Sequence, residues 1–556
     1  MMKKSKRMQW LLGSALAGTL VIGSAGFALA DTNDTTGVSC MTGANGQPMN
    51  DAQHRSMMNR MMGYMQGMMH GNGQGMMKGQ TMHRSMMDGN DQGMMQSMMS
   101  GMHGMMHQHI AIQYKNVAQA ERPLAIPPIL TPTEQEGNHV TYSLTAQQGE
   151  TELLDGHRTQ TLGYNGAMLG PVLRLTKGQQ VTMKLSNRLD EPTTFHWHGL
   201  KVDSDADGGP HNAVQPGEDK TVQFTVDQQA ATLWYHPHYM GNTARQVYQG
   251  LAGLILVEDS QETALPLPRT YGVDDIPLVI QDRYFTEDGR IDYNAVANPD
   301  GTQGDVLIVN GTVKPYITTK SHWVRYRIVN GSNASNFDVA LSGHHNFYQV
   351  ASDGGLLTRP VSLTTLRLSP GERAEIVVDM SQYKVGETAQ VTINGATALA
   401  VRIADVADTV AFSPDMALTT IAPLPELDIL ATLPRKHIEL QGMGPMVSIN
   451  GRTFSMERID EQAVLGTQEI WEVTNPSTMM GGMIHPFHMH GVQFRILSRN
   501  GQTPPAQEQG WKDTVLVNPD EKVELLVRYE RKGVFMFHCH ILEHEENGMM
   551  GQFEVK

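Results

Sequence analysis

The chain ends in a segment that places histidines on both sides of its rarest residue. Cys539, one of only two cysteines in 556 residues, stands between His538 and His540, and His544 and Met549 follow at intervals of five residues. A thiolate, an imidazole and a thioether are the ligand types of a blue-copper site, in which the thioether is the weak axial ligand. This spacing restricts the chain to folds in which these three side chains can bind the same ion.

The residues before Cys539 predict how this segment folds. Residues 534–537 are apolar or aromatic, which is typical of a strand, and we expect that strand to cover residues 534–540. Successive side chains of a strand point to opposite faces, so Cys539 should face one side while His538 and His540 face the other. One tripeptide would then join two metal sites through its own backbone.

Three further histidine clusters precede this segment. Alone, a pair of histidines two residues apart is more often a surface or core feature than a metal site. Here the four clusters together supply ten histidines and one cysteine, separated by long stretches of chain. The three upstream clusters are His196 and His198; His236 and His238; and His485, His488 and His490. A repeated pattern of this kind indicates metal binding.

The pattern resembles the multicopper oxidase family, from about residue 125 to the C-terminus. The resemblance implies four copper ions per chain, with every ligand position occupied. The type 1 ligands would be His485, Cys539, His544 and Met549, and the type 2 ligands His196 and His488. The two type 3 ions would take His198, His236 and His540 on one ion, and His238, His490 and His538 on the other.

The resemblance also implies an activity. Reduction of O2 to water needs four electrons, and in the family these enter one at a time at the type 1 site and pass through the cysteine to its neighbouring histidines. Met549 as an axial thioether is typical of a moderate reduction potential. Asp207 and Glu545 align with acids that supply protons to reduced oxygen in the family.

Within the family, the segment from His485 to Ser498 looks most like the bacterial copper-tolerance (cuprous) oxidases that also have laccase activity. The implied reductants are Cu(I), phenols and aromatic amines. Met483 keeps a methionine that holds the substrate cuprous ion in those enzymes, but Gly481 occupies the position of their aspartate. We therefore expect a type 1 edge that is more open to organic substrates.

The N-terminus predicts an exported protein. Basic residues precede an apolar run from about Trp10 to Phe27, and residues 28–30 are Ala-Leu-Ala, which is typical of a signal peptide over residues 1–30. The protein would be periplasmic, on the cell surface or extracellular, with no membrane span after processing. A retained membrane anchor is the competing interpretation. Cys40 has no partner for an intramolecular disulfide when Cys539 binds copper.

A methionine-rich segment follows over residues 31–119. Residues 41–106 hold 21 of the 39 methionines, together with Gly, Gln, Asn, Ser and several histidines, and almost no branched apolar residues. Such a composition cannot build an ordinary core, so we expect a mostly disordered segment. Thioethers suit Cu(I), which favours metal handling. A low-complexity linker or a methionine-lined helix is the alternative.

The rest of the chain predicts an all-β protein. Short apolar or alternating runs broken by Gly, Pro, Asn and Asp are typical of sandwich or barrel domains, and the resemblance makes each domain cupredoxin-like. Pro-rich stretches divide them into domains at residues 120–262, 268–412 and 430–556. We expect the copper cluster between the first and third domains, with the second as a spacer. The strands expected most clearly are 180–185, 220–226, 253–257, 323–329, 374–378, 468–473 and 523–529.

The charge and the ligand set separate the functional hypotheses. A formal net charge of -15 argues against nucleic acid as a partner. We expect a monomer that uses O2 and a small reductant. The leading hypothesis is a secreted four-copper oxidase; the alternative is a copper-sequestering protein in which residues 41–106 are the functional part. A copper nitrite reductase would not need all eight histidines assigned to the type 2 and type 3 sites.

Overall fold

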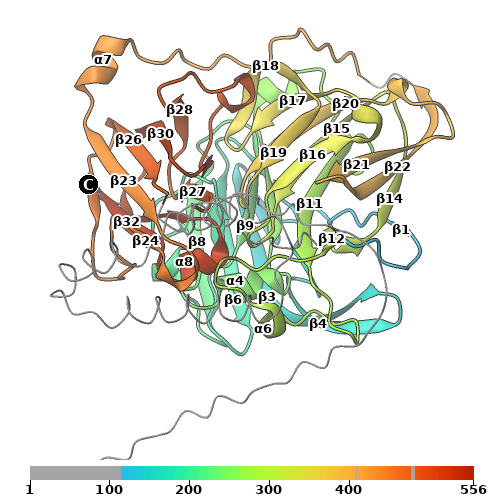
Figure 1. Cartoon of the computed structure of the whole chain (residues 1–556), viewed down its shortest axis with the longest axis horizontal. Coiled ribbons are helices and arrows are strands. Elements are labelled where there is room, and N and C mark those ends of the chain that lie inside the picture. The colour runs from blue at the N-terminus through green and yellow to red at the C-terminus, as the bar shows by residue number, and fades with distance from the viewer. Residues whose placement is uncertain (1–113, 408–409, 478–481) are drawn as a thin grey trace, which may run out of the picture. The chain divides into compact units, whose positions relative to one another are not determined.

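The computed structural model describes residues 114–407, 410–477 and 482–556. The expected signal peptide, Cys40, residues 41–106 and Gly481 lie outside this part of the chain. The predicted all-β fold is confirmed, because strands arranged in paired sheets make up most of the described structure (Figure 1). Among the described residues, no helix is both long enough and apolar enough to cross a membrane.

The first domain consists of two sheets that enclose an apolar core. One sheet has the order β5 (Leu173–Thr176), β10 (Gly253–Glu258), β9 (Ala231–His236) and β7 (His196–His198). The other has the order β2 (Glu134–Glu136), β3 (His139–Leu154), β6 (Gln180–Arg188) and β8 (Asp219–Thr225), and β4 (His157–Tyr164) pairs with β3. The core between the sheets contains Trp197 and Tyr235, which alternate with the histidines of β7 and β9.

The second domain repeats this arrangement with larger sheets. One has the order β13 (Thr312–Val313), β12 (Val306–Val309), β11 (Asp275–Arg283), β15 (Trp323–Asn330), β20 (Arg373–Asp379), β17 (Phe347–Ser352) and β18 (Gly355–Leu363). The other has the order β1 (Arg122–Pro123), β14 (Pro315–Ser321), β22 (Ala396–Ala407), β21 (Thr388–Ile393), β16 (Phe337–Leu341) and β19 (Thr365–Leu368). The structure thus places Arg122–Pro123 in a second-domain sheet, although the sequence groups these residues with the first domain.

The third domain holds the C-terminal clusters. One sheet has the order β24 (Ser448–Ile449), β23 (Arg435–Gln441), β26 (Gln468–Asn475), β30 (Glu521–Arg528) and β28 (Phe494–Arg499). The other has the order β25 (Glu461–Ala463), β32 (Met550–Val555), β31 (Gly533–Cys539), β27 (His485–Met489) and β29 (Thr514–Val517). The strands expected at 468–473 and 523–529 correspond to β26 and β30, and the other five expected strands are also present.

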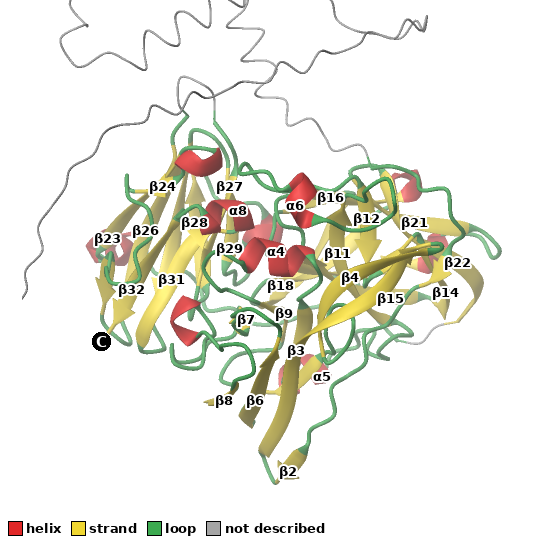
Figure 2. Ribbon diagram, turned by 90° about the horizontal axis from the view of Figure 1, so that it is seen from below, coloured by secondary structure: helices red, strands yellow, loops and turns green. Residues whose placement is uncertain are grey.

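Short helices occur in the connections between strands. They are α4 (Thr243–Tyr248), α5 (Ser260–Thr263), α6 (Tyr293–Val296), α7 (Leu427–Thr432) and α8 (Leu542–Glu546). Figure 2 shows α4 of the first domain beside α8 of the third. The backbone N–H of Ala244 in α4 donates to the Glu546 carboxylate in α8 at 2.8 Å. Leu542 of α8 also joins a buried apolar cluster with α4 and β12, so all three domains meet here.

A buried ion-pair network joins the first and second domains. Arg327 in β15 donates to both carboxylate oxygens of Asp275, at 2.6 and 2.9 Å, and to Glu375 at 2.9 Å. It also donates to the hydroxyl of Thr232 in the first domain at 3.1 Å. Because these groups are withdrawn from water, removing one partner leaves uncompensated charge in the interior.

We therefore expect Arg327→Met to destabilise the fold by about 3–5 kcal/mol, since it leaves the Asp275 carboxylate buried without its ion-pair partner, while Glu375 keeps its ion pair with Arg325. The control is Arg367→Met, which breaks a bidentate pair with Asp338 on the surface, where the arginine side chain is 56% exposed. That change should cost less than about 1 kcal/mol. Thermal unfolding of both variants measures the difference, and equal losses would contradict the assignment.

Candidate copper centres

The strand β31 separates its side chains as the sequence predicts. Cys539 faces the third-domain core, and its Sγ lies 3.5 Å from Nδ1 of His485 and 3.6 Å from Nδ1 of His544. His538 instead faces the first domain, where its Nε2 lies 3.1 Å from Nε2 of His238. Cys539 and His538 are adjacent in sequence, so the backbone between them joins two groups of metal-binding side chains.

A sharp turn brings Met549 back to the cysteine. The Met549 N–H donates to the His544 carbonyl at 2.9 Å, and the Cys539 N–H donates to the Met549 carbonyl at 3.1 Å. Gly548 makes this turn with a φ of +97°, in the left-handed region that favours glycine. His485, Cys539, His544 and Met549 are all buried, so the predicted type 1 ligands come together in the third domain.

Burial also sets the protonation of this group. It raises the pKa of the Cys539 thiol and lowers the pKa of His544 to about 4. The imidazole is therefore neutral near pH 7, which is the form that binds metal. A bound metal ion deprotonates a coordinating thiol, so the site suits a cation that binds sulphur and nitrogen together.

The other eight histidines meet between the first and third domains. Strands β7 and β9 pair so that His196 lies opposite His236, and strands β27 and β31 pair so that His488 lies opposite His538. Each strand pair thus presents its histidines on one face. The complete group is His196, His198, His236, His238, His488, His490, His538 and His540, each at most 1% exposed.

One predicted type 3 triad converges tightly. The Nε2 atoms of His238 and His490 each lie 3.1 Å from Nε2 of His538. These atoms form one of the groups in the described residues whose geometry could hold a metal ion. Three converging ring nitrogens cannot all be satisfied by protons, whereas one cation satisfies them together.

The other predicted type 3 triad is more open. Nδ1 of His198 lies 3.4 Å from Nε2 of His236, and the His540 ring centroid lies 5.0 Å and 5.4 Å from the centroids of those two rings. Both ring nitrogens of His540 are buried without a hydrogen-bond partner. The structure therefore brings these three rings together, with a nitrogen of His540 left for a ligand.

The predicted type 2 pair also has buried ring nitrogens without a hydrogen-bond partner. His196 and His488 lie with ring centroids 6.0 Å apart, and Nε2 of each is buried without a hydrogen-bond partner. A buried nitrogen without a hydrogen-bond partner costs about 1–3 kcal/mol, so two of them at one place indicate a site where a metal ion binds. The residues present therefore fit copper at both groups of side chains.

In most of these rings, the hydrogen bond made by the nitrogen that faces away from the histidine group fixes the direction of the nitrogen that faces into it. A ring that donates through one nitrogen to a carbonyl or carboxylate presents the other nitrogen to a metal. Five rings donate outward through Nδ1: His196 to Asp207 O, His236 to Pro237 O, His488 to Asp513 O, His490 to the Asp207 carboxylate and His538 to Cys539 O. Burial lowers the pKa values of His236, His490 and His538 well below the ordinary range, so these rings are neutral ligands.

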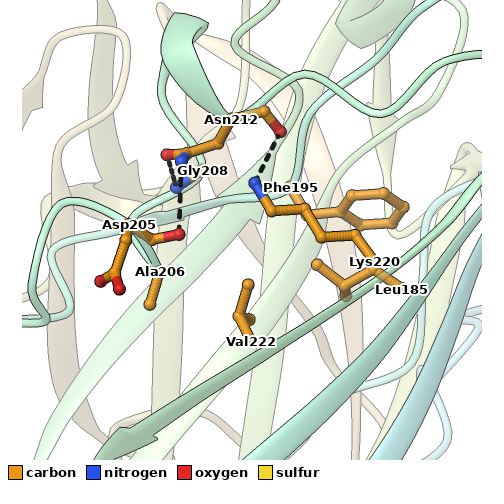
Figure 3. Close-up of a pocket in the computed structure, with 8 residues that line it drawn as sticks. All are labelled: Leu185, Phe195, Asp205, Ala206, Gly208, Asn212, Lys220 and Val222. Atoms are coloured by element: carbon orange, nitrogen blue, oxygen red, sulfur yellow. Dashed lines mark hydrogen bonds between the residues drawn. The ribbon is translucent and has the colours of Figure 1, made fainter.

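Asp207 sits on a tight loop against β7. A side chain at Gly208 would place its Cβ 1.9 Å from the Phe195 carbonyl, so only glycine fits there. Figure 3 shows the outer side of this loop, where the Gly208 N–H donates to the Asn212 side chain at 3.0 Å. The cavity beside it has a volume of about 10 Å³, far below the roughly 300–1,000 Å³ of typical small-molecule sites.

Two buried carboxyl groups lie against opposite rings of the histidine group. Asp207 Oδ2 accepts from Nδ1 of His490 at 2.8 Å and lies 3.4 Å from Nδ1 of His196. The Glu545 oxygens lie 3.4 Å from Nδ1 of His238 and 3.4 Å from Nδ1 of His538. Burial raises the pKa of Glu545 well above its ordinary range, which favours the protonated form of this carboxyl group.

Sequence reasoning missed one contact and misjudged the second domain. The Asp513 carboxylate lies 3.0 Å from Nε2 of His198, and Arg373 of the second domain donates to both of its oxygens. A Cβ at Gly371 would lie 2.9 Å from the His540 ring. The expectation of a spacer is therefore wrong, because second-domain residues pack directly on the site. No spacing in the sequence connects residues so far apart.

Met483 lies at the edge of the third-domain core. Its side chain is half-buried against this core, and its carbonyl accepts from the Asn475 side chain at 2.7 Å. It precedes the predicted type 1 ligand His485 by two residues. Its proposed partner position, Gly481, lies outside the described residues.

Comparison with known proteins identifies the family. Family models described as multicopper oxidase match residues 145–262, 274–401 and 425–556. A multicopper oxidase from Staphylococcus epidermidis is 42% identical over 450 residues, covering 81% of this chain and 96% of that protein.

Two solved structures share the fold over most of their length. A laccase from Pediococcus acidilactici is 41% identical with a TM-score of 0.78, covering 81% of this chain and 97% of that one. A laccase-like multicopper oxidase, CueO, from Ochrobactrum sp. is 39% identical with a TM-score of 0.70, covering 78% of this chain and 100% of that one. The chain therefore belongs to the multicopper oxidase family: it is an oxidoreductase with copper as its cofactor and O2 as its oxidant.

Proposed function

We propose that the protein is an exported four-copper oxidase that takes single electrons from Cu(I), phenols or aromatic amines and reduces O2 to water. One observation carries this proposal. Cys539 faces His485 and His544, while the neighbouring His538 faces the histidines at the domain boundary. The two groups are therefore joined by a single peptide unit. Residues 1–30, in which basic residues precede an apolar run, support export.

Electron acceptance and O2 reduction take place at two separate groups of side chains. Bound copper would supply one-electron storage and transfer, which no side chain of this group can supply alone. The third domain provides a buried thiol with two imidazoles for a single ion, and the domain boundary provides eight imidazoles for a cluster. Because a four-electron reduction needs stored electrons, a cluster joined to an electron-accepting site fits water formation better than release of peroxide.

Asp207 and Glu545 lie beside the histidine group, where the reaction consumes protons. Both are buried, and each contacts rings that converge on the same group, since Asp207 accepts from His490 while Glu545 lies beside His238 and His538. Water formation consumes protons as well as electrons. We assign Glu545 as the proton donor on one side of the cluster and Asp207 as the hydrogen-bond acceptor that orients rings on the other.

The proposed substrates rest on relatives and on the methionines. The Ochrobactrum enzyme has oxidase activity towards lignin model compounds and lignosulfonate, which supports phenolic reductants here. The thioethers of residues 41–106 suit Cu(I), which supports a cuprous substrate. Met483, two residues before His485, supplies a further thioether beside the predicted type 1 ligand.

The thiolate accounts for both the colour and the turnover. We expect Cys539→Ser to abolish the blue absorbance and O2 consumption together, because both depend on the Cys539 sulphur. Cys40→Ser is the matched control and should leave both unchanged, since Cys40 belongs to none of the ligand clusters. Visible absorbance and oxygen uptake measure the two effects. A colourless Cys539→Ser protein that still reduces O2 to water would contradict the proposal.

The proton-donor role predicts a selective defect in Glu545→Gln. Without the acidic proton, reoxidation of the fully reduced protein by O2 should slow by about 10²-fold or more. Reduction of the blue site under argon should keep its normal rate, because Glu545 contacts no predicted type 1 ligand through its side chain.

Glu543→Gln is the matched control for this change. Glu543 is another buried acid of α8, but its carboxylate accepts from Tyr293 and Asn333 and not from the histidine group. Stopped-flow absorbance follows both half-reactions. Equal slowing in the two variants, or slowing of both half-reactions in Glu545→Gln, would remove the proton-donor assignment.

The methionine-rich segment predicts a change in substrate preference. Deleting residues 41–106 should weaken Cu(I) oxidation at low Cu(I) and spare it at saturation, because a tethered ligand raises local concentration only while substrate is limiting. Phenol oxidation should stay the same. A protein with a Gly/Ser-rich segment of equal length controls for chain length. Equal Cu(I) kinetics in all three proteins would leave the segment as a copper sink or spacer, and faster phenol oxidation would indicate a cover.

A further inference from the structure

Arg373 of the second domain has every one of its donors satisfied at the junction of the three domains. Its guanidinium group carries five N–H donors in a fixed fork. Nη1 donates to Asp513 Oδ1 at 2.6 Å and Nη2 to Asp513 Oδ2 at 2.5 Å. The remaining donors reach carbonyls of the first and second domains: Nε to Thr232 at 3.3 Å, Nη1 to Gly371 at 3.0 Å and Nη2 to Asp353 at 3.1 Å.

Asp513 connects this arginine to two predicted copper ligands at once. Its carboxylate lies 3.0 Å from Nε2 of His198, and its main-chain carbonyl accepts from Nδ1 of His488 at 2.8 Å. The two rings come from different domains and stack with centroids 3.7 Å apart and planes 12° apart. The position of one aspartate therefore fixes one ring of the predicted type 3 set and one of the type 2 pair.

His198 is oriented oppositely to its neighbours because of this contact. An ionised carboxylate only accepts, so Nε2 of His198 carries the proton that faces Asp513, and Nδ1 points inward. The inward position of Nδ1 agrees with its distance of 3.4 Å from Nε2 of His236. Thr514 Oγ1, which donates to Asp513 Oδ1 at 2.9 Å, lies 3.1 Å from the same Nε2, so Asp513 holds both groups that select Nδ1 as the metal-facing nitrogen of His198.

The surroundings leave the ion pair no room to move. A Cβ at Gly199 would lie 2.6 Å from Arg373 Nη2 and 2.7 Å from Asp513 Oδ2. A Cβ at Gly371 would lie 2.9 Å from the His540 ring. Gly199 and Gly371 both have positive φ, at +89° and +84°, which lets the backbone approach the Arg373–Asp513 pair and the histidine group closely. Arg373 and Asp513 have fully buried side chains.

We propose that Arg373 is a positioning residue of the copper cluster: through a bidentate pair it holds Asp513 so that His198 and His488 present the correct nitrogens to the metal. The inference rests on the proposed ligand roles of these two histidines. Lysine cannot replace the arginine, because an ammonium group is a point charge that cannot orient both oxygens of a carboxylate. The second domain thereby takes part in the site without supplying a ligand.

The test compares copper retention in Arg373→Lys and in the wild-type holoprotein. Contacts of this kind that support a ligand typically change metal affinity by about 10- to 100-fold, so the variant should lose cluster copper to a chelator correspondingly more readily. The electron paramagnetic resonance signal of type 2 copper should change, because Arg373 no longer holds the Asp513 carboxylate, whose Oδ1 lies 3.6 Å from Nδ1 of His488. The blue absorbance should not change, because Arg373 contacts none of His485, Cys539 and His544.

Arg327→Lys is the matched control. It breaks a second buried bidentate pair on the neighbouring strand, at the same boundary between the first and second domains, but none of its hydrogen bonds reaches a predicted ligand. Both variants should lower the melting temperature, and only Arg373→Lys should alter copper retention and the type 2 signal. Equal retention and signals in the two variants would overturn the proposal.

A second variant covers a failure of Arg373→Lys to fold. Asp513→Asn keeps the side-chain shape but removes the charge that pairs with Arg373, and it should give the same loss of cluster copper with the blue absorbance intact. Wild-type retention and an unchanged type 2 signal in Asp513→Asn would also overturn the proposal. None of these measurements uses a reductant, so they remain valid in a protein with no oxidase turnover, which would instead refute the proposed function.

Discussion

The structure depends on the convergence of buried imidazoles at the boundary between the first and third domains. Eight buried rings meet there, and nitrogens of His196, His488 and His540 have no hydrogen-bond partner. Each such nitrogen costs about 1–3 kcal/mol when left unpaired in the interior. Copper ions remove this cost and join the two ends of the chain, so metal binding should stabilise the folded state by mass action.

The strand β31 couples this cluster to a second site. Because strand side chains alternate, the thiol of Cys539 points into the third-domain core while His538 points to the domain boundary. The same backbone thus serves both sites. The buried acids Asp207 and Glu545 complete the arrangement, since their oxygens contact the outer Nδ1 atoms of the rings and leave the inner nitrogens for the metal.

The sequence predicted the ligand clusters and the strand pattern because both are local. Spacing alone placed Cys539 and His538 on opposite faces, and alternation predicted β26 and β30 within about two residues. The contact of Arg373 with Asp513 joins positions 140 residues apart, and no local pattern marks it. For the same reason the sequence assigned the second domain a passive role, which the packing of Gly371 on His540 contradicts.

On this view, two groups of side chains, joined by one peptide unit, hold four copper ions. Anomalous diffraction at the copper edge from crystals of the copper-loaded protein tests it most directly. We expect one peak beside Cys539, His485 and His544, and three peaks among the histidines at the domain boundary. A single peak in the third domain, with none between the domains, would contradict it.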